Sequence, residues 1–235
     1  MPDRQGKLPT KSSRAEVTDF LAKVKAMPAV RPAGARGRLI FAMDATASRE
    51  PTWDRACRIQ GEMFAATRNL GGLEIQLVWY RGFGEFTASP WVDDSAALIG
   101  QMTAVTCRAG ETQIEKVLRH AIAETGRRKV NAVVFVGDCV EESIDALGAL
   151  AGKLGLLGVP VFVFHEGGEP VARRCLEEIA RLSGGAYCPF DSHSADALRD
   201  LLAAVATFAA GGRAALEDFG RRRGGIVLQL THQMR

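Results

Sequence analysis

Residues 39–48 read LIFAMDATAS, a short apolar run that ends in an aspartate and is followed by two hydroxyl residues at alternate positions. An uninterrupted apolar run is typical of a strand that is buried on both faces in the middle of a parallel sheet. Pro51 follows soon after, and proline favours the first turn of a helix. The stretch therefore predicts a strand, a loop that carries oxygen-bearing side chains, and a helix.

The same alternation of short apolar runs and helix-period segments continues to about residue 209. We expect strands over 39–44, 73–80, 84–88, 131–138, 160–165 and 185–189, and helices over 51–69, 93–103, 112–125, 142–156, 170–183 and 194–209. Such alternation is typical of βαβ units. Residues 79–90 leave no room for a crossover helix, so the second and third strands should form a hairpin. We predict an α/β fold with a doubly wound, mostly parallel six-stranded sheet, one antiparallel edge strand, and helices on both faces.

The bulk composition bounds the class of protein. The 235 residues, 47% apolar, suit one globular domain. No apolar stretch approaches the roughly 20 residues of a membrane span, and the first residues lack a signal-peptide core, so we expect a cytoplasmic protein without a membrane span. Five cysteines without C-x-x-C spacing favour reduced thiols over a disulfide framework or a zinc site.

Charge is unevenly distributed along the chain. Residues 1–39 hold nine Lys/Arg against three Asp/Glu, although the formal net charge of the whole chain is only +3. We divide the chain into a basic N-terminal arm with a short helix and linker (1–37), one domain (38–211) and a C-terminal extension (212–235). The arm has no interleaved aromatic residues for base stacking, so a nucleic acid partner is not the favoured interpretation.

The oxygen-bearing side chains after the first strand form the candidate site. In an open parallel sheet, ligands bind at the carboxyl edge where the strand order reverses, and the first strand borders that reversal. Asp44, Thr46 and Ser48 occupy alternate positions, so one carboxylate and two hydroxyls should face the same way. Such ligands suit a hard cation such as Mg2+.

The run from Asp44 to Ser48 resembles the Asp-x-Ser-x-Ser motif of the metal-ion-dependent adhesion site in von Willebrand factor A domains, with Thr46 in place of the first serine. Residues 109–112 (AGET) are similar to the Gly-x-Thr loop of that family, and residues 136–138 (VGD) to its Thr-Asp-Gly loop. The resemblance covers about 38–209 and implies a Rossmann-like fold in which Mg2+ or Mn2+ is held by Asp44, Thr46, Ser48, Thr112 and Asp138. Gly137 and Cys139 depart from the pattern, since the family usually has threonine and glycine there.

In that family the metal keeps an open position that an acidic side chain of a partner completes. The resemblance therefore implies a metal-dependent protein-interaction module, not an enzyme, which binds an Asp or Glu carboxylate of a partner protein. Similar proteins often act beside AAA+ ATPases or in assembling other complexes, which suggests an accessory role of that kind.

Other interpretations stay open at this point. Asp44, Ser48, Thr112 and Asp138 would also serve as ordinary helix caps. A nucleic-acid-associated protein would use the basic segments 4–38 and 221–223, with a vestigial metal site. A metal-dependent hydrolase would need a general base, for which Glu111 and His165 are the candidates. No Gly-x-Ser-x-Gly elbow or phosphate-binding loop is present in the sequence.

Overall fold

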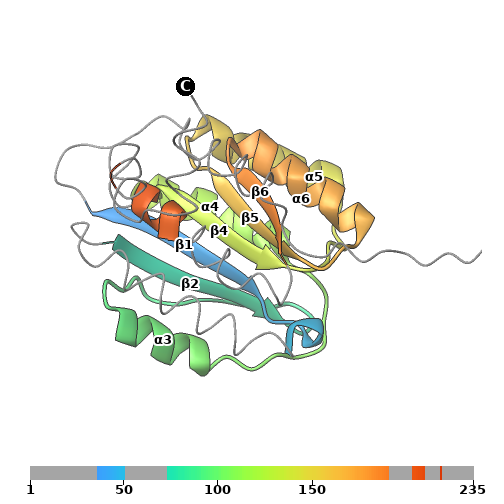
Figure 1. The fold of residues 1–235 in the computed structure, drawn as a ribbon, viewed down its shortest axis with the longest axis horizontal. Helices are drawn as coiled ribbons and strands as arrows, with labels where there is room; N and C mark the ends of the chain where they lie inside the picture. Colours follow the sequence, from blue (N-terminus) through green and yellow to red (C-terminus); the bar gives the residue numbers. More distant parts are fainter. Residues whose placement is uncertain (1–35, 51–72, 191–202, 210–217, 219–235) are drawn as a thin grey trace, which may run out of the picture.

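A computed structural model describes residues 36–50, 73–190, 203–209 and 218 of the chain (Figure 1). The basic arm before residue 36, the predicted helix over 51–69 and the C-terminal extension apart from residue 218 lie outside the described residues. Of the predicted helix over 194–209, residues 203–209 are described and are helical.

The described residues form one six-stranded sheet in the order β3-β2-β1-β4-β5-β6. The strands are β1 (Gly37–Asp44), β2 (Leu73–Arg81), β3 (Glu85–Ala88), β4 (Ala132–Gly137), β5 (Val161–Glu166) and β6 (Ala186–Phe190). All neighbours pair in parallel except β2 and β3, which form the expected antiparallel hairpin. The predicted fold class is confirmed. The strand order reverses between β1 and β4, so the switch point lies at their carboxyl ends.

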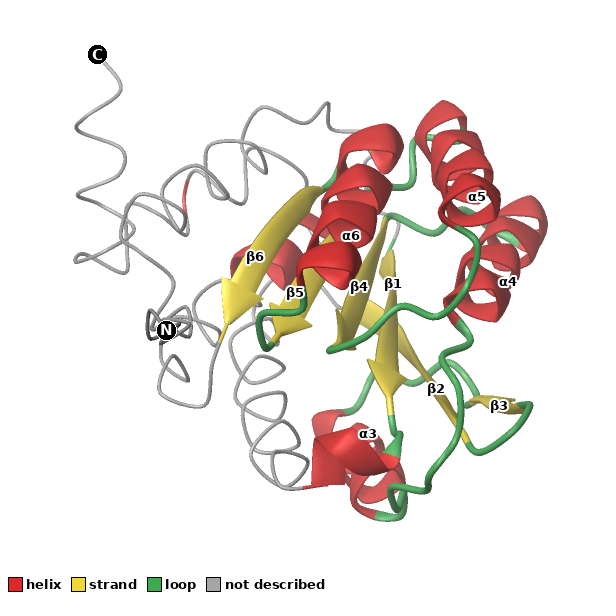
Figure 2. Cartoon of the chain, turned by 90° about the vertical axis from the view of Figure 1, so that its right-hand side faces the viewer, coloured by secondary structure: helices red, strands yellow, loops and turns green. Residues whose placement is uncertain are grey.

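The helices follow the strands as the βαβ pattern requires. They are the short 3₁₀ helix η1 (Ala47–Arg49), α3 (Ser95–Thr103), α4 (Ile114–Arg127), α5 (Ile144–Leu156) and α6 (Pro170–Ser183). Helices α4, α5 and α6 stand together on one side of the sheet (Figure 2). Sequence signals set their limits: α6 has Pro170 in its first turn and ends at Gly184 with φ +73°, a left-handed cap that glycine adopts without strain. Within the described residues, no helix is both long and apolar enough to cross a membrane.

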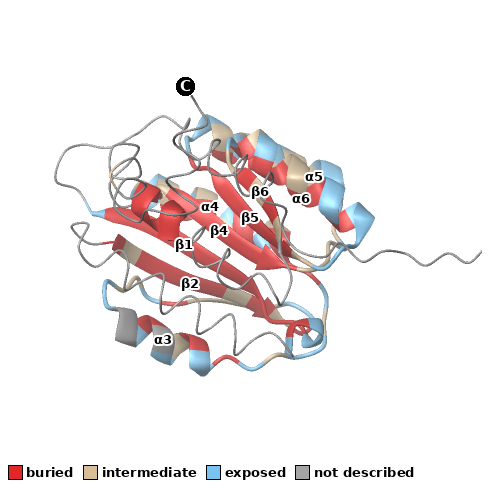
Figure 3. Cartoon of the chain, viewed as in Figure 1, coloured by how far each residue is buried: buried red, intermediate tan, exposed pale blue. Residues whose placement is uncertain are grey.

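Two apolar cores cover the two faces of the sheet. Along β1, Leu39, Phe41 and Met43 belong to the core that includes α3 and residues 203–209, whereas Ile40 and Ala42 belong to the core beneath α4, α5 and α6. This alternation follows from the two-residue period of a strand. The central strands are buried along their whole length, as Figure 3 shows. The continuous apolar runs were therefore correctly interpreted as central strands.

Three predicted helix starts were wrong by two residues each. Helix α3 begins at Ser95 rather than 93, after the capping Asp94. Helix α4 begins at Ile114 rather than 112, and α5 begins at Ile144 rather than 142. For α4 and α5 the cause is the set of hydrogen bonds that Thr112 makes with Glu141 and Glu142, described below, which hold these residues in loops ahead of the two helices. Ser143 caps α5 instead, because its hydroxyl accepts a hydrogen bond from the amide of Ala146.

Candidate metal site

Asp44 ends β1 and is fully buried. Its Oδ1 accepts a hydrogen bond of 2.7 Å from the backbone amide of Thr46, and its Oδ2 accepts one of 3.0 Å from the hydroxyl of Tyr80 on β2. Tyr80 lies directly beside Asp44 in the strand register. Burial raises the pKa of the Asp44 carboxyl, the bonds from Thr46 oppose that shift, and the charge of Asp138 adds to it. The fold therefore fixes this carboxylate and leaves its negative charge costly in the absence of a cation.

The two hydroxyls after Asp44 lie together, as their alternate spacing predicts. Thr46 Oγ1 and Ser48 Oγ are 3.1 Å apart. Thr46 is buried and Ser48 is exposed, so the pair extends from the interior to the surface. The capping interpretation of Asp44 is incomplete, because its side chain bonds the amide two residues later and a buried tyrosine.

Asp138 directly follows β4, on the other side of the switch point. Its Oδ1 is buried and has no hydrogen-bond donor among the residues that the structure describes. A buried carboxylate oxygen without a donor is uncommon in folded proteins and is normally satisfied by water or an ion. Asp138 does not cap α5, since Ser143 does so.

The glycine before Asp138, which departs from the family pattern, has a steric explanation. A Cβ on Gly137 would lie 2.8 Å from Cζ of Phe135, too close for an ordinary contact, and 3.5 Å from Cβ of Asp44. A threonine here would therefore collide with the Phe135 ring. The same distances place the end of β4 directly against the Asp44 side chain.

Thr112 is held by the loop between β4 and α5. Its hydroxyl donates to Glu142 Oε2 over 2.6 Å and accepts from the Glu141 amide over 2.9 Å, and its own amide donates to Glu141 Oε2 over 2.8 Å. One lone pair of the hydroxyl remains for a cation. The sequence interpretation missed Glu141 and Glu142, although two acids soon after Asp138 were a visible signal. Thr112 is not the N-cap of α4, a position that Gln113 occupies.

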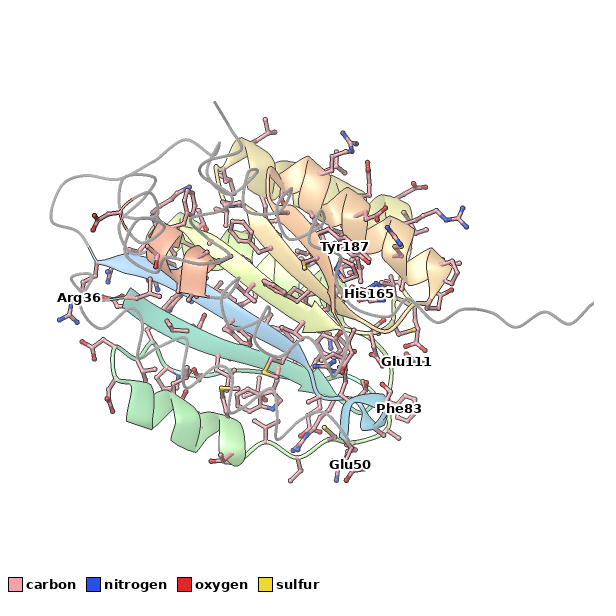
Figure 4. The ribbon with its side chains drawn as sticks, viewed as in Figure 1. Arg36, Glu50, Phe83, Glu111, His165 and Tyr187 are labelled. Atoms are coloured by element: carbon pink, nitrogen blue, oxygen red, sulfur yellow. The ribbon has the colours of Figure 1, made fainter. Side chains whose placement is uncertain are left out.

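The loop that carries Thr112 rests on the β2–β3 hairpin. The amide of Glu111 donates to the carbonyl of Gly82 over 3.3 Å, and a Cβ on Gly110 would overlap that same peptide group. Phe83, at the tip of the hairpin, is 83% exposed. Figure 4 shows Phe83, Glu111 and Glu50 at the edge of the sheet toward which the parallel strands point.

His165, near the end of β5, is buried. Its Nδ1 lies 2.8 Å from the hydroxyl of Tyr187, and its Nε2 lies 3.2 Å from the backbone oxygen of Asp138. Burial lowers the pKa of His165, which favours the neutral ring. A neutral imidazole that donates from Nε2 and accepts at Nδ1 satisfies both contacts. His165 thus helps to hold the backbone of the Asp138 loop in place through its contact with the Asp138 backbone oxygen.

Arg49 is another charged residue at this edge that the sequence interpretation did not single out. Its side chain is 1% exposed and forms an ion pair with Glu166 at the end of β5. Burial lowers the pKa of Arg49, while the negative charges of Asp138 and Asp44 act to raise it. The signal was its position, immediately after Ser48.

The donor set fits a hard divalent cation. Two carboxylates and three hydroxyls are oxygen ligands of the kind Mg2+ and Mn2+ prefer, and the buried Asp138 oxygen lacks a donor in the described part of the chain. Those described residues contain no group of three or more His, Cys, Asp or Glu side chains suited to a metal, so the hydroxyls are essential to the donor set. Cys139 is a free thiol whose pKa burial raises, which disfavours a reactive thiolate.

The sheet order, its one antiparallel strand and the polar side chains at the switch point define a von Willebrand factor A fold. The SpRpn10 VWA domain is 13% identical, with a TM-score of 0.58 over 72% of this chain and 94% of that one. A von Willebrand factor type A protein from Catenulispora acidiphila is 17% identical, with a TM-score of 0.58 over 72% and 42%. Proximal thread matrix protein 1 from the mussel byssus, described with a zinc-occupied MIDAS motif, is 16% identical, with a TM-score of 0.59 over 75% and 47%. No family model and no curated protein matches the sequence. The likenesses establish the fold.

Proposed function

We propose that the chain is a metal-dependent protein-interaction module in which Asp44, Thr46, Ser48, Thr112 and Asp138 hold Mg2+ or Mn2+. The observation that carries the proposal is the buried Asp138 oxygen without a donor among the described residues, at the strand end that lies against the buried Asp44. A divalent ion would satisfy that oxygen and offset the raised pKa of Asp44. The zinc-occupied MIDAS of proximal thread matrix protein 1, on a similar fold, supports a divalent ion at this edge.

The ligand of the module is an Asp or Glu carboxylate on a partner protein. Glu50, Glu111 and Glu141 are exposed around the site, so without a metal this edge repels an acidic group. A bound divalent ion would turn this repulsion into attraction at its open coordination position and make the interaction metal-dependent. The exposed ring of Phe83 offers an apolar anchor next to the site, and aromatic residues often supply much of the energy of a protein interface.

Binding without turnover is the better account of the site. Both ring nitrogens of His165 are engaged, so His165 is not placed to take a proton from water. Glu111 lies at the exposed rim. The four described cysteines are free, which suits the reducing cytoplasm. An accessory role to an AAA+ ATPase or another assembly system is a hypothesis that rests on the family resemblance alone.

The first test is a calorimetric titration of Mn2+ and Mg2+ into the chelator-treated full chain. We expect saturable one-site binding that falls at least about tenfold in Asp44→Ala, because removing one charged ligand costs more than about 1.4 kcal/mol. The control is Asp93→Ala, which removes an exposed aspartate that pairs with Arg36, a residue at the opposite end of the sheet in Figure 4. Equal affinity in wild type and Asp44→Ala would refute the assigned ligands.

A further inference from the structure

Two arginine side chains are buried among the described residues, and they lie at opposite ends of β1. Arg38, near the start of the strand, stacks 3.6 Å from the centre of the Trp91 ring and pairs with Glu124. Arg49 lies beyond the end of the strand, as the last residue of η1, next to Ser48. Burying a guanidinium is costly unless nearby anions compensate it. The role of Arg49 can therefore be inferred from the anions that balance its buried charge.

The strand order puts the end of β4, which belongs to the candidate site, between Arg49 and its ion-pair partner. Arg49 belongs to η1, which follows β1, and its ion-pair partner Glu166 ends β5. Strand β4 lies between β1 and β5 in the sheet. A side chain that reaches from η1 to Glu166 must pass over the end of β4, where Asp138 stands. Neighbouring strands are only about 4.8 Å apart, so this path keeps the guanidinium close to Asp138.

The electrostatics agree with this path. After the burial effect, the charges of Asp138 and then Asp44 are the strongest influences on the pKa of Arg49, and both raise it. The negative charges of both carboxylates proposed as metal ligands therefore favour the charged form of Arg49, whose ion pair is with Glu166.

We propose that Arg49 is the built-in counter-cation of the site, which neutralises Asp44 and Asp138 in the metal-free chain and competes electrostatically with a divalent ion for them. This inference rests on the proposed metal site and adds a regulator of its affinity. A fixed positive charge near both carboxylates makes the metal-free fold stable. It also repels an incoming divalent ion. The repulsion is strong because the side chain is buried, where water does not screen its charge. The site is accordingly tuned toward weak, reversible metal binding.

The test compares Arg49→Met with Arg38→Met in the full chain, using Mn2+ as the probe. Methionine keeps much of the length of the side chain and removes the charge. We expect Arg49→Met to bind Mn2+ at least about tenfold more tightly than wild type, since one charge at close range in a buried site is worth more than about 1.4 kcal/mol. Its melting temperature should fall in chelator and recover largely with Mn2+.

Arg38→Met should also lower the melting temperature, because it breaks a buried ion pair, but it should leave the Mn2+ affinity within about twofold of wild type. An Arg49→Met affinity equal to or weaker than wild type would overturn the inference. If Arg49→Met does not fold in chelator, the double variant Asp44→Asn/Arg49→Met decides. The inference expects the double variant to regain a native circular dichroism spectrum, because the charge that needed balancing is gone, and a double variant that stays unfolded would overturn it.

Mn2+ binding by the wild-type chain tests the proposed function separately from the inference about Arg49. If wild type binds Mn2+ and Arg49→Met binds it no better, the inference fails and the proposed function stands. If wild type does not bind Mn2+ but Arg49→Met does, the inference is supported and the wild-type chain is not a metal-dependent module. If neither binds, both fail.

Discussion

At the residue scale, the geometry of the site depends on how one buried carboxylate is held. Tyr80 and Asp44 face each other across neighbouring strands, and the buried phenol donates to Asp44 Oδ2 over 3.0 Å. Tyr80 also stacks on Phe135, with ring centres 6.5 Å apart. Burial and the neighbouring Asp44 charge raise the pKa of Tyr80 well above its ordinary value, so the phenol stays a hydrogen-bond donor. The strand register thus positions the carboxylate without the help of a bound metal.

We predict that Tyr80→Phe lowers the free energy of unfolding by about 1.5–3 kcal/mol, the usual range for a lost hydrogen bond to a charged group. Urea unfolding at neutral pH in chelator measures it. In an Asp44→Ala background the same substitution should cost at least about 1 kcal/mol less, because the acceptor is already gone. Additive effects of the two substitutions would show that the hydrogen bond contributes little.

At the scale of elements, the site is a ring of loops that bind one another. Ala45 accepts from the amide of Arg108, which joins the loop after β1 to the loop before α4. Thr112 joins that second loop to the loop after β4 through Glu141 and Glu142. The hairpin supports the second loop where Gly82 and Gly110 approach each other. A disturbance at one contact should therefore reach the residues proposed as metal ligands.

Gly110→Ala tests this coupling. The added methyl group would overlap the Gly82 peptide, so the loop and the hairpin must separate, at a cost of about 2 kcal/mol or more. We expect weaker Mn2+ binding as well, because Thr112 shifts with its loop. Denaturant unfolding and Mn2+ titration measure the two effects.

The matched control is Gly126→Ala, in the last turn of α4. A Cβ there meets no atom within 4 Å. Alanine is the better helix former by about 0.5–1 kcal/mol, so this variant should be unchanged or slightly more stable. If the two variants behave alike, the contact between loop and hairpin does not support the site.

At the scale of the whole molecule, the sheet could be predicted from the sequence, but the contacts that surround the candidate site could not. The apolar runs, the missing crossover helix and the alternation in LIFAMDATAS are local patterns, and they predicted the strands, the hairpin and the Thr46–Ser48 pair. The ion pair of Arg49 with Glu166 and the bonds of Thr112 to two glutamates join segments far apart in the chain. No local periodicity encodes such contacts. The bonds of Thr112 also shifted the starts of α4 and α5, because tertiary hydrogen bonds outweighed helix propensity.

His120 connects α4 to the hairpin side of the sheet and makes the stability of the whole domain depend on pH. Its Nε2 lies 2.8 Å from Gln76 Oε1 on β2, and its ring lies against Phe86 on β3. Burial lowers the pKa of His120 below the ordinary 6.5, although Glu124 acts to raise it. The unfolded chain therefore binds a proton more readily than the folded chain, so this contribution to stability is present above pH 6.5 and is lost as the pH falls below it.

We expect His120→Gln, whose amide can still donate to Gln76, to lose less stability than wild type between pH 7.5 and pH 5.5. Urea unfolding of both proteins at the two pH values gives the comparison, and the effects of other titrating groups cancel in the difference between the two proteins. An equal loss in both proteins would mean that the folded chain accepts the proton without penalty. In that case, burial between α4 and the hairpin would not control the acid sensitivity of the domain.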